Sequence, residues 1–424
     1  MPNTEKLLTA LHIFYRGLFA VLLACGLSIS ASANEGIAEV QAAFGSNTVD
    51  GKRMQVAVAI KGGGSLGTYE AGVSWGLLRI LKKFEASGGP TVDLLAAAGA
   101  SAGAFNGVMS AVYWCGVDLG LDTIDTNVIS DSWRGVDIKD LLDFPEVVEP
   151  EVFASKGLFD TECAASSDPQ VGANETEDNG LFSRRVFRRT QDTLQCMMEK
   201  PLFQKGCSVA VGLTLTRADA VRIDNAGIEV SNQRLVVPMR LAEIDGGRFA
   251  AHRLPLETGN MAFDRSIIHL DSGVADKSTD GKIKHEAVFQ AVKGSSSFPM
   301  AFSPIKLDYC LRYQAGNAKF LQNYEPNGYD DRCPEEFRRL TSYFVDGGVF
   351  DNDPIGVVRH LAEYGDTRVG EVFYVNIDPG RRRQSRGIAK LEITPFNQPG
   401  DSIAVEMRSG RFPNLISARQ SHQK

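Results

Sequence analysis

The sequence predicts an α/β protein in which a mostly parallel sheet lies between layers of helices. Three segments carry this prediction, because in each an apolar strand ends in a glycine-containing turn that leads toward a helix. The strands are Met54–Ile60, Val92–Ala98 and Tyr343–Val345. Strands that alternate with helices usually run parallel, with the helices covering both faces of the sheet. We therefore expect the three strand ends to meet at one edge of the sheet.

The first unit starts with the apolar run Met54–Ile60 and continues through a glycine loop into the helical stretch Thr68–Phe84. The loop reads Lys61-Gly62-Gly63-Gly64-Ser65-Leu66-Gly67. A loop of this kind presents bare backbone N–H groups to an anion. We expect its glycines to form an oxyanion hole, with the amides of Gly63 and Gly64 as the main donors. The glycines concerned are Gly62, Gly63, Gly64 and Gly67.

The same loop also satisfies the spacing G-x-G-x-x-G, so a dinucleotide-binding fold is an alternative. That fingerprint requires an acidic residue at the end of the second strand. Asp93 lies near the start of the next strand instead, which disfavours a nicotinamide site. No Gly-Lys-Ser/Thr follows the loop, so a nucleotide-binding P-loop is excluded. The sequence predicts neither an organic cofactor nor a metal ion.

The second unit ends in Gly99-Ala100-Ser101-Ala102-Gly103, where the strand meets a helix over Ala102–Tyr113. The pattern G-x-S-x-G is typical of a nucleophile elbow, whose flanking glycines, here Gly99 and Gly103, prevent collisions at the tight turn. Ser101 is therefore the candidate nucleophile. The helix N-terminus favours an oxyanion, and the Ala102 N–H is a further donor. The alternative is that Ser101 only caps a helix rich in Gly and Ala.

The third unit ends in Asp346-Gly347-Gly348, directly after the strand Tyr343–Val345. A carboxylate at the carboxyl end of such a strand points into the crevice where open α/β sheets bind ligands. A serine needs a base to become a nucleophile, and burial raises the pKa of an aspartate toward a useful range. Asp346 is therefore the candidate general base. The alternative is a turn residue before the helix that Pro354 opens.

In this order, the three blocks resemble the signatures of the patatin-like phospholipases, and the resemblance runs from about Met54 to Asp378. The segments Tyr69–Val73 and Ser295–Pro299 are also similar to that family. The resemblance implies a Ser–Asp dyad, chemistry without a metal, and hydrolysis of acyl esters, usually of glycerophospholipids. One residue departs from the pattern: Leu66 stands where many members carry Arg or Lys.

Two alternatives to a dyad hydrolase stay open. An ordinary α/β-hydrolase has the chain order serine, acid, histidine. His360 follows Asp346 but falls in the helix that Pro354 opens, while His422 lies in the C-terminal tail. The remaining core histidines precede Asp346 and break that order; they are His252, His269 and His285. The second alternative is a catalytically idle relative that only binds lipid.

The N-terminus predicts export. Residues 1–33 combine a basic start, the apolar run Gly17–Gly26 and the cleavage pattern Ala31-Ser32-Ala33, as in a signal peptide. The apolar run is shorter than the roughly 20 residues that span a bilayer. Alternatively, Leu22-Leu23-Ala24-Cys25 resembles a bacterial lipoprotein box, in which Cys25 would carry lipid. The mature protein is then periplasmic, secreted or anchored to a membrane by that lipid.

The cysteine count agrees with export. Six cysteines remain beyond the leader, and an even number in an exported protein suggests disulfides. They are Cys115, Cys163, Cys196, Cys207, Cys310 and Cys333. Proximity suggests that Cys196 pairs with Cys163 or Cys207, and that Cys310 pairs with Cys333. The absence of C-x-x-C spacings gives zinc little support, and free thiols are the alternative.

Composition indicates one large globular domain. The chain has 424 residues, of which 43% are hydrophobic and 23% charged, and its net charge is −7. A mildly acidic protein is not an obvious nucleic-acid binder and is not drawn to anionic membranes, so contact with lipid should be apolar and local. We expect a membrane lipid or another acyl ester as the partner. The predicted divisions are a linker at 34–53, the acyl hydrolase domain at 54–380 with a polar insertion near 160–182, and a polar, basic tail at 381–424.

Further elements are expected along the domain. They are a basic amphipathic helix over Ser183–Lys200, a strand over Ser208–Thr216, strand pieces at Val221–Ile223, Arg234–Val237 and Arg248–Leu254, a helix over Lys284–Val292 and a strand over Glu371–Ile377. The basic helix either lies on a membrane or exposes a solvated face.

Overall fold

The computed structural model describes residues 53–117, 119, 122–124, 127–133, 141, 163, 180–225, 228–259, 261–264, 266–271, 281–312, 333, 337–364, 372–379, 391–393 and 405–407. The expected leader lies outside these residues, and so do most of the linker, of the polar insertion and of the C-terminal tail.

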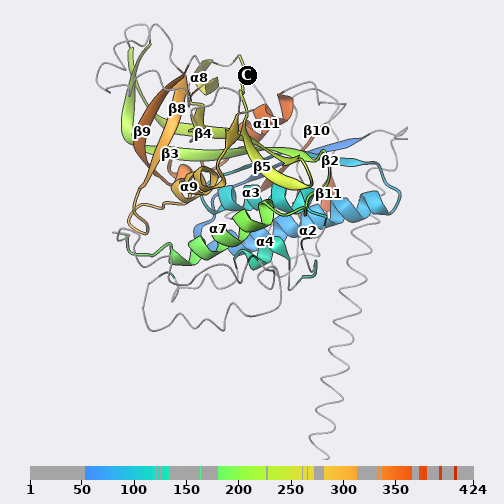
Figure 1. Ribbon diagram of the computed structural model, residues 1–424. Coiled ribbons are helices and arrows are strands. Elements are labelled where there is room, and N and C mark those ends of the chain that lie inside the picture. Colours follow the sequence, from blue (N-terminus) through green and yellow to red (C-terminus); the bar gives the residue numbers. More distant parts are fainter. Residues whose placement is uncertain are drawn as a thin grey trace, which may run out of the picture.

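A sheet of ten strands forms the centre of the molecule (Figure 1). Four strands lie next to one another in parallel, in the order β10-β1-β2-β3. Their bounds are β1 Met54–Ile60, β2 Val92–Gly99, β3 Ser208–Asn225 and β10 Val372–Ile377. All seven residues of β1 are buried. A parallel strand covered on both faces has no reason to alternate with polar residues, which explains its nearly continuous apolar sequence.

Beyond β3 the sheet is antiparallel, so it is mixed rather than mostly parallel. One branch continues through β4 (Ile228–Ile244), β5 (Arg248–Arg253) and β7 (Lys282–Ile283). The other leaves β3 through β9 (Phe337–Val345), β8 (Ile305–Arg312) and β6 (Ile268–Leu270). Short connections such as the one from β4 to β5 permit only antiparallel neighbours, because a parallel crossover needs a dozen or more residues.

Helices cover both faces of the sheet, which confirms the α/β class and its three layers. One face is covered by α2 (Gly67–Ala86), α3 (Ala102–Cys115), α4 (Val128–Asp131), α7 (Arg185–Met198) and α9 (His285–Ser295). The other face carries α11 (Ile355–Glu363), with the short α8 (Met261–Asp264) beside it. Figure 1 shows α11 above the sheet and α2, α3 and α7 below it.

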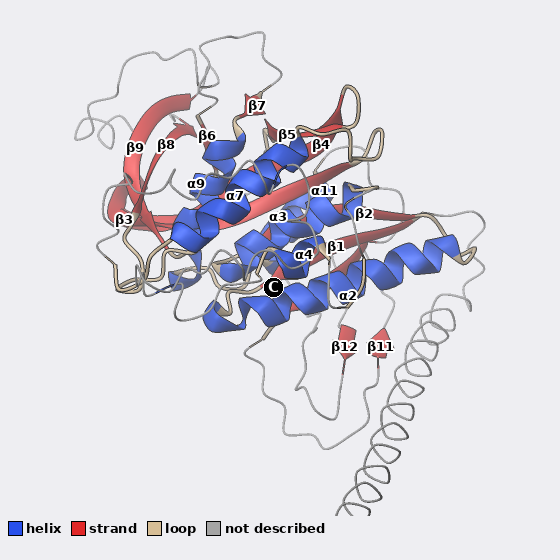
Figure 2. Ribbon diagram, turned by 60° about the horizontal axis from the view of Figure 1, so that its bottom comes forward, coloured by secondary structure: helices blue, strands red, loops and turns tan. Residues whose placement is uncertain are grey.

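Alternation along β1 divides the core into two parts. Val56, Val58 and Ile60 pack in the larger apolar cluster, with the helices α2, α3 and α9. Ala57 and Ala59 point to the opposite face and pack with α11. All 14 residues of α3 are buried, since this helix lies between the sheet and the outer helices, as the turned view shows (Figure 2). The outer helices thus enclose the helix that directly follows Ser101.

The helices and strands expected from sequence within the described residues are confirmed, but two strands are much longer than expected: β9 begins at Phe337 instead of Tyr343, and β3 continues past Thr216 to Asn225. The predicted helices correspond to α2, α3, α7, α9 and α11, and Pro354 is the N-cap residue of α11. The separate strand pieces are parts of the long, paired strands β3, β4 and β5. Among the described residues, no helix combines the length and the apolar character that crossing a membrane requires.

Three disulfides join the six cysteines. Cys163–Cys196 and Cys310–Cys333 confirm two expected pairs. The alternative pairing of Cys196 with Cys207 is wrong, because Cys207 joins Cys115 across 92 residues. That bond connects the end of α3 to the start of β3, which only the packing of α3 on the sheet brings together.

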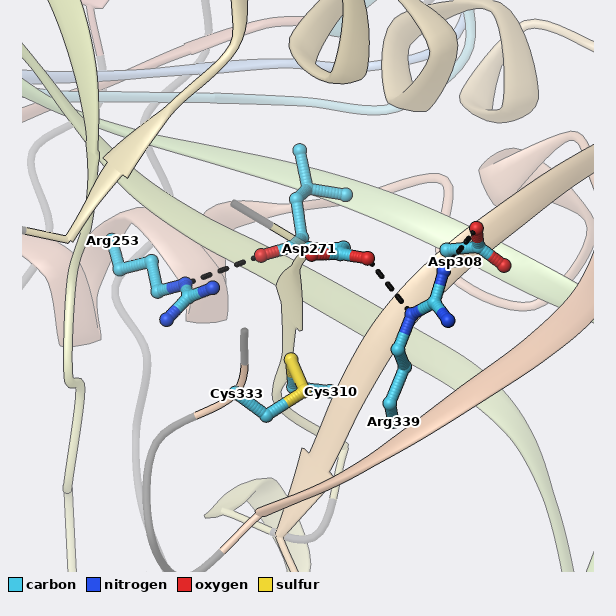
Figure 3. Close-up of a disulfide and its surroundings, with 7 residues drawn as sticks. Arg253, Asp271, Asp308, Cys310, Cys333 and Arg339 are labelled. Carbon is cyan, nitrogen blue, oxygen red and sulfur yellow. Dashed lines mark hydrogen bonds and ion pairs between the residues drawn. A yellow bond between two sulfur atoms is a disulfide. The ribbon is translucent and has the colours of Figure 1, made fainter. Parts of the chain in front are cut away.

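The Cys310–Cys333 bond lies close to a chain of ionic contacts between β8, β9 and the residue that follows β6 (Figure 3). Arg339 donates from Nε to Asp271 Oδ2 at 2.8 Å and from Nη2 to Asp308 Oδ2 at 2.8 Å. The disulfide therefore attaches residue 333 to a part of the sheet in which ion pairs already join neighbouring segments. Three disulfides suggest that the protein works in an oxidising, exported environment.

Candidate active site

Two turns at the same level of the sheet bring Ser101 and Asp346 together. Ser101 Oγ donates a hydrogen bond to Asp346 Oδ2 at 2.6 Å, although the residues are 245 positions apart. Both are buried, with 8% and 3% of their surface exposed.

β3 explains this meeting, because it pairs with both strands that lead to the site. Gly99 at the end of β2 lies opposite Leu213, and Val345 at the end of β9 lies opposite Thr216, three positions further along β3. The strand ends do converge as expected, but not because the strands are all parallel. β9 runs antiparallel to β3 and reaches the same level from the opposite direction.

The backbone of Ser101 is strained. Its φ of 53° and ψ of −128° lie in a region that costs a residue with a side chain about 1–3 kcal/mol. The two elbow glycines allow this turn, because a Cβ at Gly99 would lie 1.9 Å from the carbonyl oxygen of Gly103. A Cβ at Gly103 would lie 2.3 Å from the carbonyl oxygen of Ile60. Only glycine lets β1, β2 and α3 approach so closely at this point.

Three consecutive serines at the end of α9 are hydrogen-bonded to the backbone of the Ser101 turn and of the Asp346 turn. Ser295 Oγ accepts from the Ser101 N–H at 3.1 Å, and Ser296 Oγ donates to the Ser101 carbonyl at 3.0 Å. The carbonyl of Ser297 accepts from the Asp346 N–H at 2.9 Å. In the sequence, this segment was noted only for its resemblance to the family. In the structure, it fixes the turn at Ser101 and the turn at Asp346 relative to each other.

The two carboxylate oxygens of Asp346 have different partners. Oδ2 faces Ser101, while Oδ1 accepts from the Gly348 N–H at 2.7 Å and caps the short helix η5 (Gly347–Val349). The interpretation of Asp346 as a turn residue is therefore also correct, for one of its oxygens. Burial raises the pKa of Asp346, and the hydrogen bonds from Ser101 and Gly348 oppose that rise only in part. A carboxylate with a raised pKa is a stronger base.

Asn352 joins the glycine loop to the loop that carries Asp346. Its Oδ1 accepts from the Gly62 N–H at 2.9 Å, and its Nδ2 donates to the Gly62 carbonyl at 3.2 Å. Sequence reasoning missed this residue. The available signal was an asparagine two residues before Pro354, which by itself indicates only a turn.

The expected oxyanion donors divide into two groups. The Gly62 N–H is taken by Asn352, and the Gly67 N–H donates to the carbonyl of Gly64. Within the described part of the chain, the three other predicted amides have no protein acceptor. They belong to Gly63, Gly64 and Ala102. The open amides lie in the glycine loop and at the first residue of α3.

A buried glutamate, Glu70, packs against the glycine loop and shares a hydrogen-bond partner, Asn106, with it. A Cβ on Gly63 would lie 2.0 Å from Glu70 Oε1. Asn106 Nδ2 donates to Glu70 Oε2 at 3.2 Å and to the Gly67 carbonyl at 3.0 Å, while Trp133 Nε1 donates to Asn106 Oδ1 at 2.7 Å. Burial raises the pKa of Glu70 to about 8, so this side chain is largely protonated at neutral pH.

A cavity of about 540 Å³ opens beside Ser101. Its wall is mainly apolar and aromatic, formed by Phe105, Trp133, Leu141, Phe182, Phe187, Phe289, Val292, Phe298, Ala301 and Phe302. Gly64 and Ala102 line the end of the cavity that contains Ser101, and Arg184 and Lys293 are the charged residues of the wall. The rings lock one another in place; those of Phe105 and Trp133 meet edge to face at 5.5 Å. The cavity can hold an extended apolar group next to the serine.

Two of the described histidines have partners other than Asp346. The His360 ring packs on Phe263 with 4.2 Å between their centroids, on the face covered by α11. His285 Nε2 lies 3.1 Å from the Phe249 carbonyl oxygen. Among the described residues no histidine is hydrogen-bonded to Asp346, and no group of three or more His, Cys, Asp or Glu could hold a metal ion.

Fold and site together define an α/β protein of hydrolase type, in which a serine on a strained turn faces a buried carboxylate beside an apolar cavity. The family model of the patatin-like phospholipases matches residues 58–359. The chain belongs to the patatin-like phospholipase family, which confirms the resemblance noted in the sequence. Comparison with curated proteins and with solved structures gave no match. Membership of the family supports lipid acyl hydrolase activity, with a lipid ester as substrate.

Proposed function

We propose that the protein is a phospholipase A-type or lysophospholipase-type hydrolase that uses Ser101 as nucleophile and Asp346 as general base. The observation that carries this proposal is the hydrogen bond of 2.6 Å between Ser101 Oγ and Asp346 Oδ2, at one end of an apolar cavity. A hydrogen bond of this length lies within the range over which a base takes a proton directly.

In the proposed reaction, Asp346 Oδ2 takes the proton of Ser101 as Oγ attacks the ester carbonyl carbon. The tetrahedral intermediate collapses, the carbon–oxygen bond to the alcohol breaks, and Asp346 returns the proton to the leaving alkoxide. The acyl group is now an ester of Ser101. A water molecule then loses a proton to Asp346 and attacks that ester, which releases the fatty acid and restores the serine.

We assign the oxyanion hole to the open amides of Gly63, Gly64 and Ala102. Gly64 and Ala102 line the cavity together with Ser101, and Gly63 directly precedes Gly64 in the loop, so these unused N–H groups can donate to the oxygen that becomes negative in the intermediate. Helix α3 begins at Ala102, and the partial positive charge of its N-terminus also stabilises the oxyanion. Gly62 and Gly67, also expected to be donors, are better assigned a structural role, because their N–H groups are already bonded.

The cavity is proposed to hold the acyl chain. Its wall is mainly apolar and aromatic, with Arg184 and Lys293 as its charged residues, and a hydrocarbon chain gains by leaving water for such a wall. The alcohol portion of the lipid would then stay at the mouth of the cavity. This orientation requires no recognition of one particular headgroup, which agrees with Leu66 in place of a basic residue in the glycine loop.

A fluorophosphonate probe tests the assignment, because it modifies only a serine that a base activates. We expect labelling at Ser101, loss of labelling in Ser101→Ala, and release of fatty acid from mixed phospholipids by the unmodified protein. An idle lipid-binding relative would bind lipid but resist the probe. A Ser–Asp–His hydrolase would be labelled too, and the His360→Ala variant separates that case.

We also propose that residues 1–33 are removed on export. The support is the signal-like leader together with three disulfides. Mass spectrometry of the protein from its native host should find Asn34 at the N-terminus and no free thiols. A lipid-modified Cys25 at the N-terminus would instead identify a membrane-anchored lipoprotein.

A further inference from the structure

Three large apolar side chains project into solvent at the mouth of the cavity. Leu181, Phe298 and Met300 are exposed to 68%, 61% and 91%, and we call them the apolar rim. The two segments that carry them are hydrogen-bonded to each other, since the Leu181 N–H donates to the Met300 carbonyl at 3.1 Å and the Phe182 N–H to that of Ala301 at 2.7 Å. Phe182, Phe298 and Ala301 also line the cavity. The rim is thus continuous with the cavity wall.

Met300 is unusual in both backbone and exposure. Its φ is +71°, and among the described residues only Ser101 shares a positive φ with a side chain present. That conformation favours glycine and asparagine. Neither burial nor backbone preference therefore accounts for a methionine at this position. Its apolar side chain is left almost fully exposed, at 91%.

The loop that presents Met300 is held firmly from inside. The N–H groups of Ala301 and Phe302 both donate to the Phe298 carbonyl, at 3.1 and 3.0 Å. Arg184 donates to Ser297 Oγ at 2.8 Å, and its guanidinium lies 5.0 Å from the centre of the Phe302 ring. The inner side chains are packed and bonded while the outer ones meet water, so the exposure follows from the loop's fixed geometry.

Exposed apolar residues also occur in the two other loops of the site. Leu66 in the glycine loop is 43% exposed, and Val349 and Phe350 after Asp346 are 49% and 55% exposed. Of the nine large hydrophobic residues that are exposed in the described part of the chain, six therefore belong to four segments: the two that carry the rim, the glycine loop and the loop after Asp346. A concentration of this kind indicates a contact surface rather than chance exposure.

We propose that the apolar rim inserts into the surface of a zwitterionic lipid bilayer around the mouth of the cavity. This inference rests on the proposed function, in which the cavity receives an acyl chain. A chain that passes from the bilayer along the rim into the cavity never crosses water, so the rim lowers the cost of extracting the lipid. Because the protein carries a net charge of −7, the contact draws on apolar burial and not on attraction to anionic headgroups.

The test compares two double variants with equal numbers of exposed apolar residues changed. The rim variant is Leu181→Gln with Met300→Asn, and neither residue lines the cavity. The control variant is Val117→Gln with Ile124→Gln, which are 65% and 71% exposed and belong to none of the site loops. Each is placed in the Ser101→Ala background, and binding to phosphatidylcholine vesicles is measured by sedimentation. We expect the rim variant to bind at least about tenfold more weakly and the control to bind like its parent.

Activity separates this inference from the proposed function. With Ser101 present, the rim variant should hydrolyse a monomeric, water-soluble short-chain ester at the parental rate but vesicle lipid about tenfold more slowly. If the parent hydrolyses neither substrate, the proposed function is wrong. If the parent is active and the rim variant binds and hydrolyses vesicles as well as the control, the bilayer contact is wrong. Binding that requires anionic lipid and disappears in salt would also overturn it.

Structural damage is distinguishable as well. Asparagine suits a positive φ better than methionine, so Met300→Asn should keep or raise the melting temperature while it weakens vesicle binding. If Met300→Asn lowers the melting temperature, Leu181→Gln alone decides: parental vesicle binding by that folded variant would contradict the inference.

Discussion

Asn352 forms two hydrogen bonds with the backbone of Gly62: its Oδ1 accepts from the Gly62 N–H at 2.9 Å, and its Nδ2 donates to the Gly62 carbonyl at 3.2 Å. The two residues are 290 positions apart and lie in different loops of the site. A Cβ on Gly348 would lie 2.7 Å from Asn352 Oδ1 and 2.9 Å from Asp346 Oδ1. One side chain thus couples the loop of the proposed base to the loop of the proposed oxyanion hole.

Replacing Asn352 by alanine should release the glycine loop and lower kcat about tenfold or more, with little change in KM. The reason is that the loop's amides act on charge that develops in the transition state. Steady-state kinetics on a soluble ester measures both constants. Asn352→Asp keeps the acceptor oxygen but adds a negative charge near Asp346, which raises the pKa of Asp346. In this variant the loss of activity at acidic pH should therefore begin at a higher pH than in the parent. A raised KM with unchanged kcat in Asn352→Ala would assign the loop to substrate binding instead.

Asp346→Asn should reduce turnover by two or more orders of magnitude, because an amide of the same shape cannot accept the proton of Ser101. The matched control is His360→Ala, which removes a ring that packs on Phe263 on the other face of the sheet. The control should keep most of the activity. Equal losses in the two folded variants would favour a Ser–Asp–His triad.

Activity should decline as the pH falls through the pKa of Asp346. Burial raises that pKa above the ordinary aspartate value of 3.8, and only the ionised form can take a proton from Ser101. The decline should therefore begin at a higher pH than for an exposed aspartate. The measurement is kcat/KM on a soluble ester from about pH 4 to about pH 8. A single acidic limb that survives in His360→Ala supports Asp346 as the titrating base.

Glu70 should make the protein less stable as the pH rises. Its pKa in the folded protein is about 8 because of burial, against an ordinary value of 4.5. Between these values the unfolded chain has released the proton that the folded protein still holds, so the free energy of unfolding falls with rising pH. Glu70→Gln should remove this decline. The free energy of unfolding of the variant, relative to that of the parent, should therefore be more favourable at about pH 8 than at about pH 4, by more than about 1 kcal/mol. Denaturant unfolding at both pH values is the measurement.

Two neighbouring glycines should differ in how they respond to alanine. A Cβ on Gly63 would meet Glu70 Oε1 at 2.0 Å and Pro379 Cγ at 2.9 Å, whereas one on Gly64 meets nothing within 4 Å. Gly63→Ala should therefore lower both the melting temperature and kcat. Gly64→Ala should act only through its φ of +54°, with a stability loss of about 1 kcal/mol and a fall in kcat. Unchanged kcat in both folded variants would contradict the oxyanion assignment.

The sequence was sufficient for features that depend on neighbours along the chain. The strand, glycine turn and helix around Ser101 follow from the apolar run of β2 and from turns in which a Cβ at Gly99 or Gly103 would collide with backbone. The same local logic identified Asp346 at a strand end. These are short-range steric and hydrophobic preferences, and they act wherever the rest of the fold places the segment.

Only the tertiary structure decided which distant groups meet. Asn352 and Gly62, the serines of Ser295–Ser297 with both turns, and Cys115 with Cys207 are contacts between elements far apart in the chain. The antiparallel half of the sheet belongs to the same class, because the partner of β3 depends on long-range packing and not on its own alternation. Hydrogen-bonding groups such as an asparagine amide or a serine hydroxyl carry no directional signal in sequence. Their partners are determined only when the sheet and helices bring the loops to one place.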